Sequence, residues 1–165
     1  MGFRHIAGLC LFLAVTTVWS QTPVEVPEWS EENTPPQPAY SKDKLIPIEM
    51  PSYVTLHVGV DPETLQVGAT DGVVRYVVVM RNASGSTNAS YEGILCTKGE
   101  VKTYARADAN GKWTTVQNSE WTPMSDNLPS RHAYAIAKQG GCDGRTSAKR
   151  EETIRALKRQ KKAFD

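Results

Sequence analysis

The residues of this chain that could do chemistry are few and lie far apart in the sequence. Arg75 and Glu92 carry opposite charges inside two apolar segments, Asp71 precedes the first of these, and His132 follows much later. A carboxylate and an imidazole can transfer protons when a fold brings them together. The sequence contains no GxSxG, HExxH, P-loop or dinucleotide motif. It therefore favours a non-catalytic protein over an enzyme; a hydrolase-type site assembled around Arg75, Glu92 and His132 is the alternative.

Arg75 and Glu92 belong to two segments that should pair as an antiparallel hairpin. Asp71-Gly72 predicts a turn before the first strand. The apolar run Val73–Met80 is rich in β-branched residues, which is typical of a strand covered on both faces. The small polar residues of Asn82–Asn88 suit a loop, and Ser90–Cys96 follows as the second strand. We expect this hairpin to be the centre of the sheet.

The two charges of the hairpin allow two interpretations. The simpler one is a cross-strand ion pair between Arg75 and Glu92 on the wetter face, worth about 0.2–1 kcal/mol. The other is a polar pair that grips a ligand. Trp113 and Trp121 are large apolar groups that form core by default, and a tryptophan-lined binding groove is the alternative. The candidate ligand-binding residues are Arg75, Tyr91, Glu92 and Trp113.

The first twenty residues predict export. Arg4 and His5 precede the apolar run Ile6–Val15, and small residues stand at Val18 and Ser20. A basic start, a short apolar core and a small-residue cleavage site make a secretory signal peptide, here over residues 1–20. We therefore expect a periplasmic protein, with association with the outer membrane as the alternative. Export disfavours nucleic acid as a partner.

Export also changes how the cysteines are interpreted. Cys10 lies in the signal peptide, so the mature chain keeps Cys96 and Cys142, an even pair in an oxidising compartment. A disulfide between them closes a separation of 142 − 96 = 46 residues and should contribute roughly 4 kcal/mol. Metal-ligand spacing is missing around them. We predict a Cys96–Cys142 disulfide, no metal and no cofactor.

Several short strings give the chain a family resemblance. DGVVRY at Asp71–Tyr76, NASYEGILC at Asn88–Cys96 and a later tryptophan and cysteine resemble the cryptic neisserial protein-like family of small exported proteobacterial proteins. The resemblance extends from about Trp29 to Cys142. Leu95 departs from it, because the resemblance implies an arginine there, so a binding role of that arginine is absent. The family carries no biochemical activity over to this chain.

Composition divides the mature chain into three parts. Residues 21–50 form a proline-rich acidic arm, with Trp29, Tyr40, Leu45 and Ile46 as points that could attach it to the fold. Residues 51–142 form the domain. Residues 143–165 form a basic tail with a helix over Ser147–Phe164, whose thin apolar content predicts weak docking. Such a tail could contact an anionic surface.

The remaining patterns predict an α+β fold. Strands are expected over Tyr53–Val60, Val101–Ala107 and Lys112–Gln117, in addition to the hairpin. Asp61–Thr64 should form a turn, and Leu65–Ala69 a short strand or an extended link. A helix over Arg131–Gln139 should begin at Ser130 as N-cap and end at Gly140-Gly141. We predict a mainly antiparallel sheet of about five strands with one packed helix, or alternatively a small open barrel.

These features leave three functions open. The first is an exported protein that binds an envelope protein or a small ligand without catalysis. The second is the hydrolase-type enzyme, which requires Asp71, Arg75, Glu92 and His132 to meet in one cleft. The third is a structural component of the envelope that works through its arm and tail. The sequence favours the first.

Overall fold

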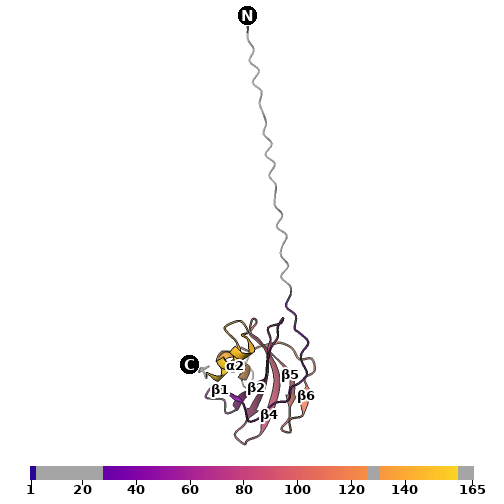
Figure 1. Ribbon diagram of the computed structural model, residues 1–165, viewed down its shortest axis with the longest axis vertical. Coiled ribbons are helices and arrows are strands. Elements are labelled where there is room, and N and C mark those ends of the chain that lie inside the picture. The colour runs from indigo at the N-terminus through magenta and orange to yellow at the C-terminus, as the bar shows by residue number, and fades with distance from the viewer. Residues whose placement is uncertain (3–27, 126–130, 160–165) are drawn as a thin grey trace.

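A computed structural model of the chain describes residues 1–2, 28–125 and 131–159. Seven strands form one antiparallel sheet, rather than about five. They are β1 (Ile46–Ile48), β2 (His57–Val67), β3 (Val74–Arg81), β4 (Thr87–Leu95), β5 (Glu100–Ala107), β6 (Trp113–Thr115) and β7 (Thr122–Pro123). Figure 1 shows the sheet with the helix α2 (Arg150–Lys158) beside it. The hydrogen-bonded order runs from β1 to β6, and β7 pairs with β5. The predicted mainly antiparallel α+β architecture is confirmed, with more strands than expected.

The additional strands lie where proline argued against a strand. β1 comes from the proline-rich arm, and its Pro47 pairs with Gly59 of β2. An edge strand tolerates proline because one of its sides needs no backbone donor. β7 likewise ends in Pro123 and pairs only with the start of β5. The arm predicted for residues 21–50 is therefore, from residue 46, part of the sheet.

The long strand β2 spans most of the predicted strand Tyr53–Val60, the predicted turn Asp61–Thr64 and the first part of the segment Leu65–Ala69. The pairing of β2 with β3 is regular up to Asp61, shifts in register and resumes at Gln66. Within the shift, Asp61 accepts a hydrogen bond from the Glu63 backbone and Thr64 donates one to the Asp61 carbonyl. These local bonds form a turn-like bulge without ending the strand. The strand also begins later than predicted, and Tyr53 is exposed.

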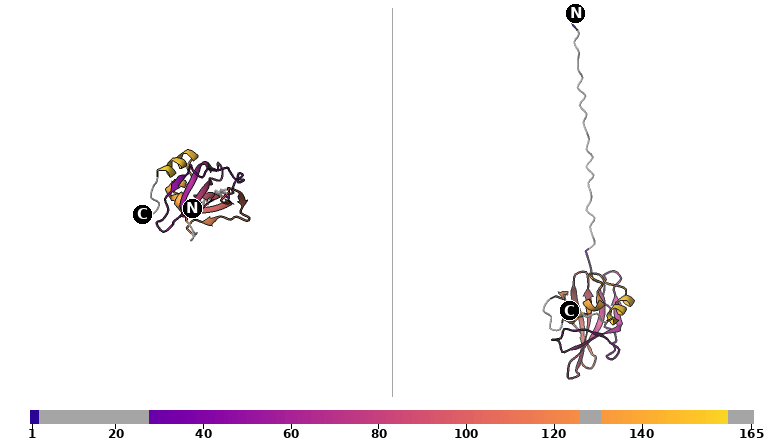
Figure 2. Two further views of the ribbon diagram at one scale, coloured as in Figure 1. Left: turned by 90° about the horizontal axis from the view of Figure 1, so that it is seen from below. Right: turned by 90° about the vertical axis from the view of Figure 1, so that its left-hand side faces the viewer.

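Two helical segments cover one face of the sheet (Figure 2). The first is α1 (His132–Ile136), which continues as the π-helical turn η1 (Ala137–Gly141) where the sequence predicted one helix ending at Gln139. Its N-cap is Arg131 rather than Ser130, which lies outside the described residues. The second is α2 (Arg150–Lys158). Among the described residues, no helix is both long and apolar enough to span a membrane.

Helix α2 is firmly docked, which corrects the expectation of a weakly attached tail. Leu157 and Thr153 are fully buried, and the Arg150 guanidinium donates hydrogen bonds to the carbonyls of Leu65 and Pro62 on β2. The buried Gln139 donates to the carbonyls of Pro47 and Leu157 and accepts from the Glu49 backbone. These polar anchors compensate for the short apolar stripe.

The sheet has an apolar core on each face. The helix-side core contains Val60, Tyr76, Val78, Ile94, Ile136 and Leu157, among others. The arm-side core contains Val77, Val79, Tyr91 and Tyr104, and residues Tyr40, Leu45 and Trp113 pack against it. The strand over Val74–Arg81 is therefore covered on both faces, as its continuous apolar run predicted. The helices cover one face of this strand, and the arm covers the other.

The arm is held on its face by aromatic and backbone contacts at both ends. Trp29 donates from its indole nitrogen to the Asp71 carbonyl (2.9 Å) and meets Trp121 edge to face. Further along, Trp113 donates to the Pro38 carbonyl and packs on Tyr40. These contacts confirm that Trp29 and Tyr40 attach the arm to the fold.

A buried arginine explains why the arm must lie there. Arg75 points from β3 into the arm-side face, where its side chain is 3% exposed. Its Nη2 lies 2.6 Å from an Asp71 carboxylate oxygen and 3.7 Å from Glu31 of the arm. A buried guanidinium needs such counter-charges, because desolvation without them is costly. The arm therefore supplies part of the charge compensation of the core.

Glu31 gathers several donors around one carboxylate. It accepts hydrogen bonds from Lys102 Nζ (2.8 Å), Tyr104 Oη (2.7 Å) and Trp121 Nε1 (3.2 Å). Burial raises the pKa of Glu31, but these hydrogen bonds outweigh it and hold the pKa below its ordinary value. Gly93 makes room for the arrangement, since a Cβ there would lie 2.5 Å from Tyr104 Oη.

Replacing Glu31 by glutamine should lower the free energy of unfolding by about 1–3 kcal/mol, because Arg75 and Lys102 lose a shared counter-charge. Urea unfolding measures this difference. Glu28→Gln is the matched control, because Glu28 is an exposed glutamate of the same arm and its change should stay within about 0.5 kcal/mol. Equal effects of the two substitutions would show that Glu31 does not hold the arm.

Candidate functional site

The structure brings Glu92 and His132 together beneath the helices. Nε2 of His132 lies 3.0 Å from Glu92 Oε1 and 2.9 Å from Oε2. The hydroxyl of Tyr76 donates to Glu92 Oε2 at 3.3 Å. Glu92 and Tyr76 are direct partners across β4 and β3, so they share one face, and His132 opens α1 above them. Three residues far apart in the sequence thus form one polar cluster.

The cluster is unusual because it is buried. The side chain of Glu92 is 3% exposed and that of His132 is 15% exposed. Burial of the imidazole disfavours its charged form, but the adjacent Glu92 carboxylate more than offsets this, so the pKa of His132 lies above its ordinary value. The pKa of Tyr76 is well above its ordinary value because of burial and the same carboxylate. Below that raised pKa, the imidazolium and the carboxylate form a buried ion pair, with the phenol as a neutral donor.

Glu92 and His132 line a cavity of about 790 Å³. Strand register explains which neighbours join them: Thr103 pairs with Glu92, and Arg106 pairs with Ser90. Most other polar groups of the wall are neutral hydrogen-bonding side chains: Asn88, Ser90, Thr103, Thr114, Asn118, Ser119 and Thr122. Cavities of roughly 300–1,000 Å³ with a few fixed polar groups are the usual form of small-ligand sites. This cavity is the candidate site.

The predicted ion pair between Arg75 and Glu92 is wrong. Arg75 pairs in register with Gly93, whereas Glu92 pairs with Tyr76. Neighbouring residues of a strand point to opposite faces, so Arg75 faces the arm and Glu92 faces the helices. Neither lies on a wet face, because both are almost fully buried. Each charge has its own partners: Asp71 and Glu31 for Arg75, His132 for Glu92.

The other residues singled out from the sequence belong to the arm-side face. Tyr91 is 1% exposed and packs against Tyr104, with ring centroids 5.3 Å apart. Trp113 packs on Tyr40 of the arm. Asp71 accepts hydrogen bonds from Arg75 and from the Glu32 backbone. The sheet thus divides the candidate cluster into two pairs: Asp71 and Arg75 meet on the arm side, and Glu92 and His132 meet on the helix side.

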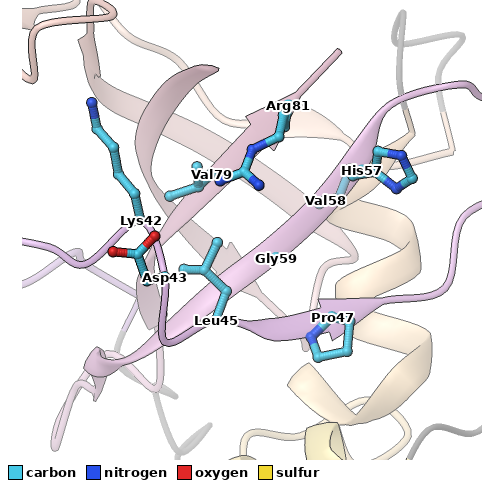
Figure 3. A pocket seen from close by; sticks show the side chains of 9 residues that line it. All are labelled: Lys42, Asp43, Leu45, Pro47, His57, Val58, Gly59, Val79 and Arg81. Atoms are coloured by element: carbon cyan, nitrogen blue, oxygen red, sulfur yellow. The ribbon is translucent and has the colours of Figure 1, made fainter. Parts of the chain in front are cut away.

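The arm side also carries a shallower pocket of about 420 Å³ (Figure 3). Its floor is apolar, with Leu45, Gly59 and Val79, and Arg81 and His57 stand at its rim. Arg81 and His57 are both exposed, and Lys42 of the same rim donates to the Ala109 carbonyl. Because it contains no buried charged group, this pocket is a weaker candidate than the Glu92–His132 cavity.

The structure brings the sulfur atoms of Cys96 and Cys142 to disulfide-bonding distance, 2.04 Å. The pair joins the end of β4 to the end of η1 and lies beside the helix-side core. In the part of the chain that the structure describes, three or more histidine, cysteine or carboxylate side chains nowhere gather as metal ligands would.

Sequence reasoning missed Ser90, Thr103 and Arg106 as wall residues. The alternation along Ser90–Cys96 placed Ser90 and Glu92 on one face, which was the available signal. It did not reveal Thr103 and Arg106, because strand register depends on a bulge between Tyr91 and Glu92. It also did not reveal that His132 would reach Glu92, since the separation is 40 residues.

Fold and site together define a small α+β protein with an antiparallel sheet, an arm on one face, and a helix-capped polar cavity on the other. The model of the CNP1-like family matches residues 24–158. The chain therefore belongs to the CNP1-like family, as the resemblance in its sequence indicated.

The chain is also similar to an individual protein of known name. Cryptic neisserial protein 1 of Neisseria gonorrhoeae is 28% identical over 165 aligned residues. The alignment covers 87% of this chain and 79% of the relative. No solved structure matches the chain. These similarities show the family of the chain and name no biochemical activity.

The Glu92–His132 pair should make stability depend on pH in a defined direction. A histidine with a raised pKa stabilises the fold below its unfolded value of about 6.5, and this contribution is lost as pH rises through its folded pKa. Glu92→Gln should therefore cost about 1.5–3 kcal/mol at pH 5.5 and less at pH 8.5. Urea unfolding of both proteins at the two values measures this. A cost independent of pH would contradict the ion pair.

Proposed function

We propose that this chain is an exported, non-catalytic protein of the cell envelope that binds a small polar ligand in the Glu92–His132 cavity. The observation that carries the proposal is a buried ion pair in the wall of a 790 Å³ cavity. A fold that holds a carboxylate and an imidazole in fixed positions has its polar contacts arranged before a ligand arrives. Such preorganisation lowers the cost of binding.

The wall indicates the chemistry of the ligand. Arg106 and protonated His132 stand against Glu92, Asp108 and Glu120, so the charges nearly balance. The remaining polar groups are hydroxyls and amides, which both donate and accept hydrogen bonds. A molecule rich in hydroxyl and amide groups, such as an amino sugar or a short peptide, can satisfy these groups without bringing a large net charge.

The location in the envelope is supported by the N-terminal pattern and by the cysteine pair. Residues 1–20 have the composition of a signal peptide, and a disulfide is favoured in an oxidising compartment. Once cleaved, the chain would begin a few residues before the arm contacts at Trp29. The anionic-surface contact proposed for the basic tail is compatible with this location.

Export predicts a specific mature N-terminus. When the full chain is expressed in a bacterium, we expect it in the periplasmic fraction, starting at Gln21, with no free thiol after denaturation. Cell fractionation measures the location, and mass spectrometry of the purified protein measures the N-terminal residue and the number of free thiols. Recovery from the cytoplasm with residue 1 intact, or two reactive thiols, would refute the assignment.

Binding is tested by titrating the mature protein with a muramidase digest of peptidoglycan, which contains amino sugars and short peptides. We expect NMR shifts at His132 and Ser90, and at least tenfold weaker binding after Glu92→Gln. Glu63→Gln is the matched control, because Glu63 is an exposed carboxylate of β2 that does not line the cavity. Absence of shifts, or equal losses in both variants, would contradict the proposal.

A hydrolase-type enzyme remains the second candidate, because Glu92 and His132 could together move a proton in the cavity. Arg75 cannot take part, because it lies on the opposite face of the sheet from Glu92. The same digest separates the two functions: a binding protein returns the ligand unchanged, whereas an enzyme converts it, and Glu92→Gln stops the conversion. Chromatography of the digest before and after incubation distinguishes these outcomes.

A further inference from the structure

Another pocket, which shares no wall residue with the Glu92–His132 cavity, lies where the turn between β4 and β5 meets η1. Its volume is about 380 Å³, within the range of small-ligand sites. Lys98 comes from the turn, Lys138 from η1, and Arg145 from the loop before α2. The disulfide between Cys96 and Cys142 forms part of its wall.

The charges of this pocket are all of one sign. Lys98, Lys138 and Arg145 line it, and none of the described residues in its wall is a carboxylate. Among the described residues, none of the three cations forms an ion pair with a carboxylate. Like charges gathered around one hollow repel one another, so an anion placed among them is stabilised.

The contacts that the three cations make leave their charge available. Lys98 lies over the Trp29 ring at 4.9 Å, and Lys138 over the Tyr134 ring at 5.6 Å. Arg145 donates from Nη2 to the Thr97 carbonyl at 2.8 Å. Ring faces and a neutral carbonyl orient a cation without neutralising it. The pocket therefore presents three positive charges that no carboxylate in its described wall neutralises.

The rest of the wall is apolar. Tyr134, Met124 and Ala137 line the pocket beside the disulfide. A ligand that fits both parts carries an anionic group and an apolar or aromatic group. Inorganic ions alone would leave the apolar part of the wall unused.

The disulfide joins the two segments that carry the three cations. Lys98 follows Cys96 by two residues, Lys138 precedes Cys142 by four, and Arg145 follows Cys142 by three. The two cysteine Cα atoms are 5.7 Å apart, so the bond fixes the separation of the segments that carry the charges. Without it, the repulsion among the cations would favour a wider pocket.

We propose that this pocket binds a small organic anion, a phosphate or carboxylate attached to an aromatic or short alkyl group, and that the Cys96–Cys142 disulfide is required for its affinity. The site is independent of the Glu92–His132 cavity. A free organic phosphate and the headgroup of an anionic lipid share this chemistry.

Phenyl phosphate is the probe, with phenol as its uncharged counterpart. Isothermal calorimetry and NMR of the mature protein should detect phenyl phosphate, with shifts at Gly99 and Gly144, and much weaker binding of phenol. The double variant Lys138→Gln/Arg145→Gln should bind at least tenfold more weakly. The control Lys112→Gln/Arg155→Gln loses the same charge at exposed residues outside the pocket and should bind as the wild type does.

Two further arms test the disulfide and the source of the anion. Dithiothreitol, which is uncharged, should weaken phenyl phosphate binding while circular dichroism shows that the sheet persists. Unchanged affinity after reduction, or loss of the sheet together with the binding, would overturn the proposed role of the disulfide at this pocket. Co-sedimentation with phosphatidylglycerol vesicles, against phosphatidylcholine, separates a lipid headgroup from a free anion. Equal binding by the two double variants, or equal binding of phenol and phenyl phosphate, would overturn the proposal.

Discussion

The ion pair between Arg75 and Asp71 is the constraint on which the rest of the structure depends. Arg75 lies in the strand that the sheet buries on both faces, and a guanidinium there must keep its counter-charges. Asp71, four residues earlier, supplies the first, and Glu31 of the arm supplies the second. The arm therefore lies across this face because the charge in the core requires it.

The same hairpin carries a second buried charge on its other face. Glu92 is next to the register partner of Arg75, so alternation turns it toward the helices, where His132 compensates it. One face is thereby closed by the arm, and the other keeps a cavity beside a fixed carboxylate and imidazole. The two buried charges of the hairpin thus lie on opposite faces: Arg75 binds the arm, and Glu92 lines the cavity.

Sequence patterns predicted the hairpin, its antiparallel neighbours and the cysteine pair, because each depends on local alternation, turn residues or a count. They did not predict β1 or the docking of α2. In β1, an edge position tolerates Pro47, and in α2, bonds from Arg150 and Gln139 replace apolar contacts. Glu92 and His132 were suspected separately, whereas the cavity between them was not foreseen.

The sequence by itself determined the central strands of the sheet, the family of the chain and the presence of charges in a strand that had to be buried. Only the tertiary structure decided which charge meets which partner. The physical reason is register: a shift of one residue moves a side chain to the opposite face. Arg75 and Glu92, which should have met across the hairpin, instead lie on opposite faces with partners from distant segments.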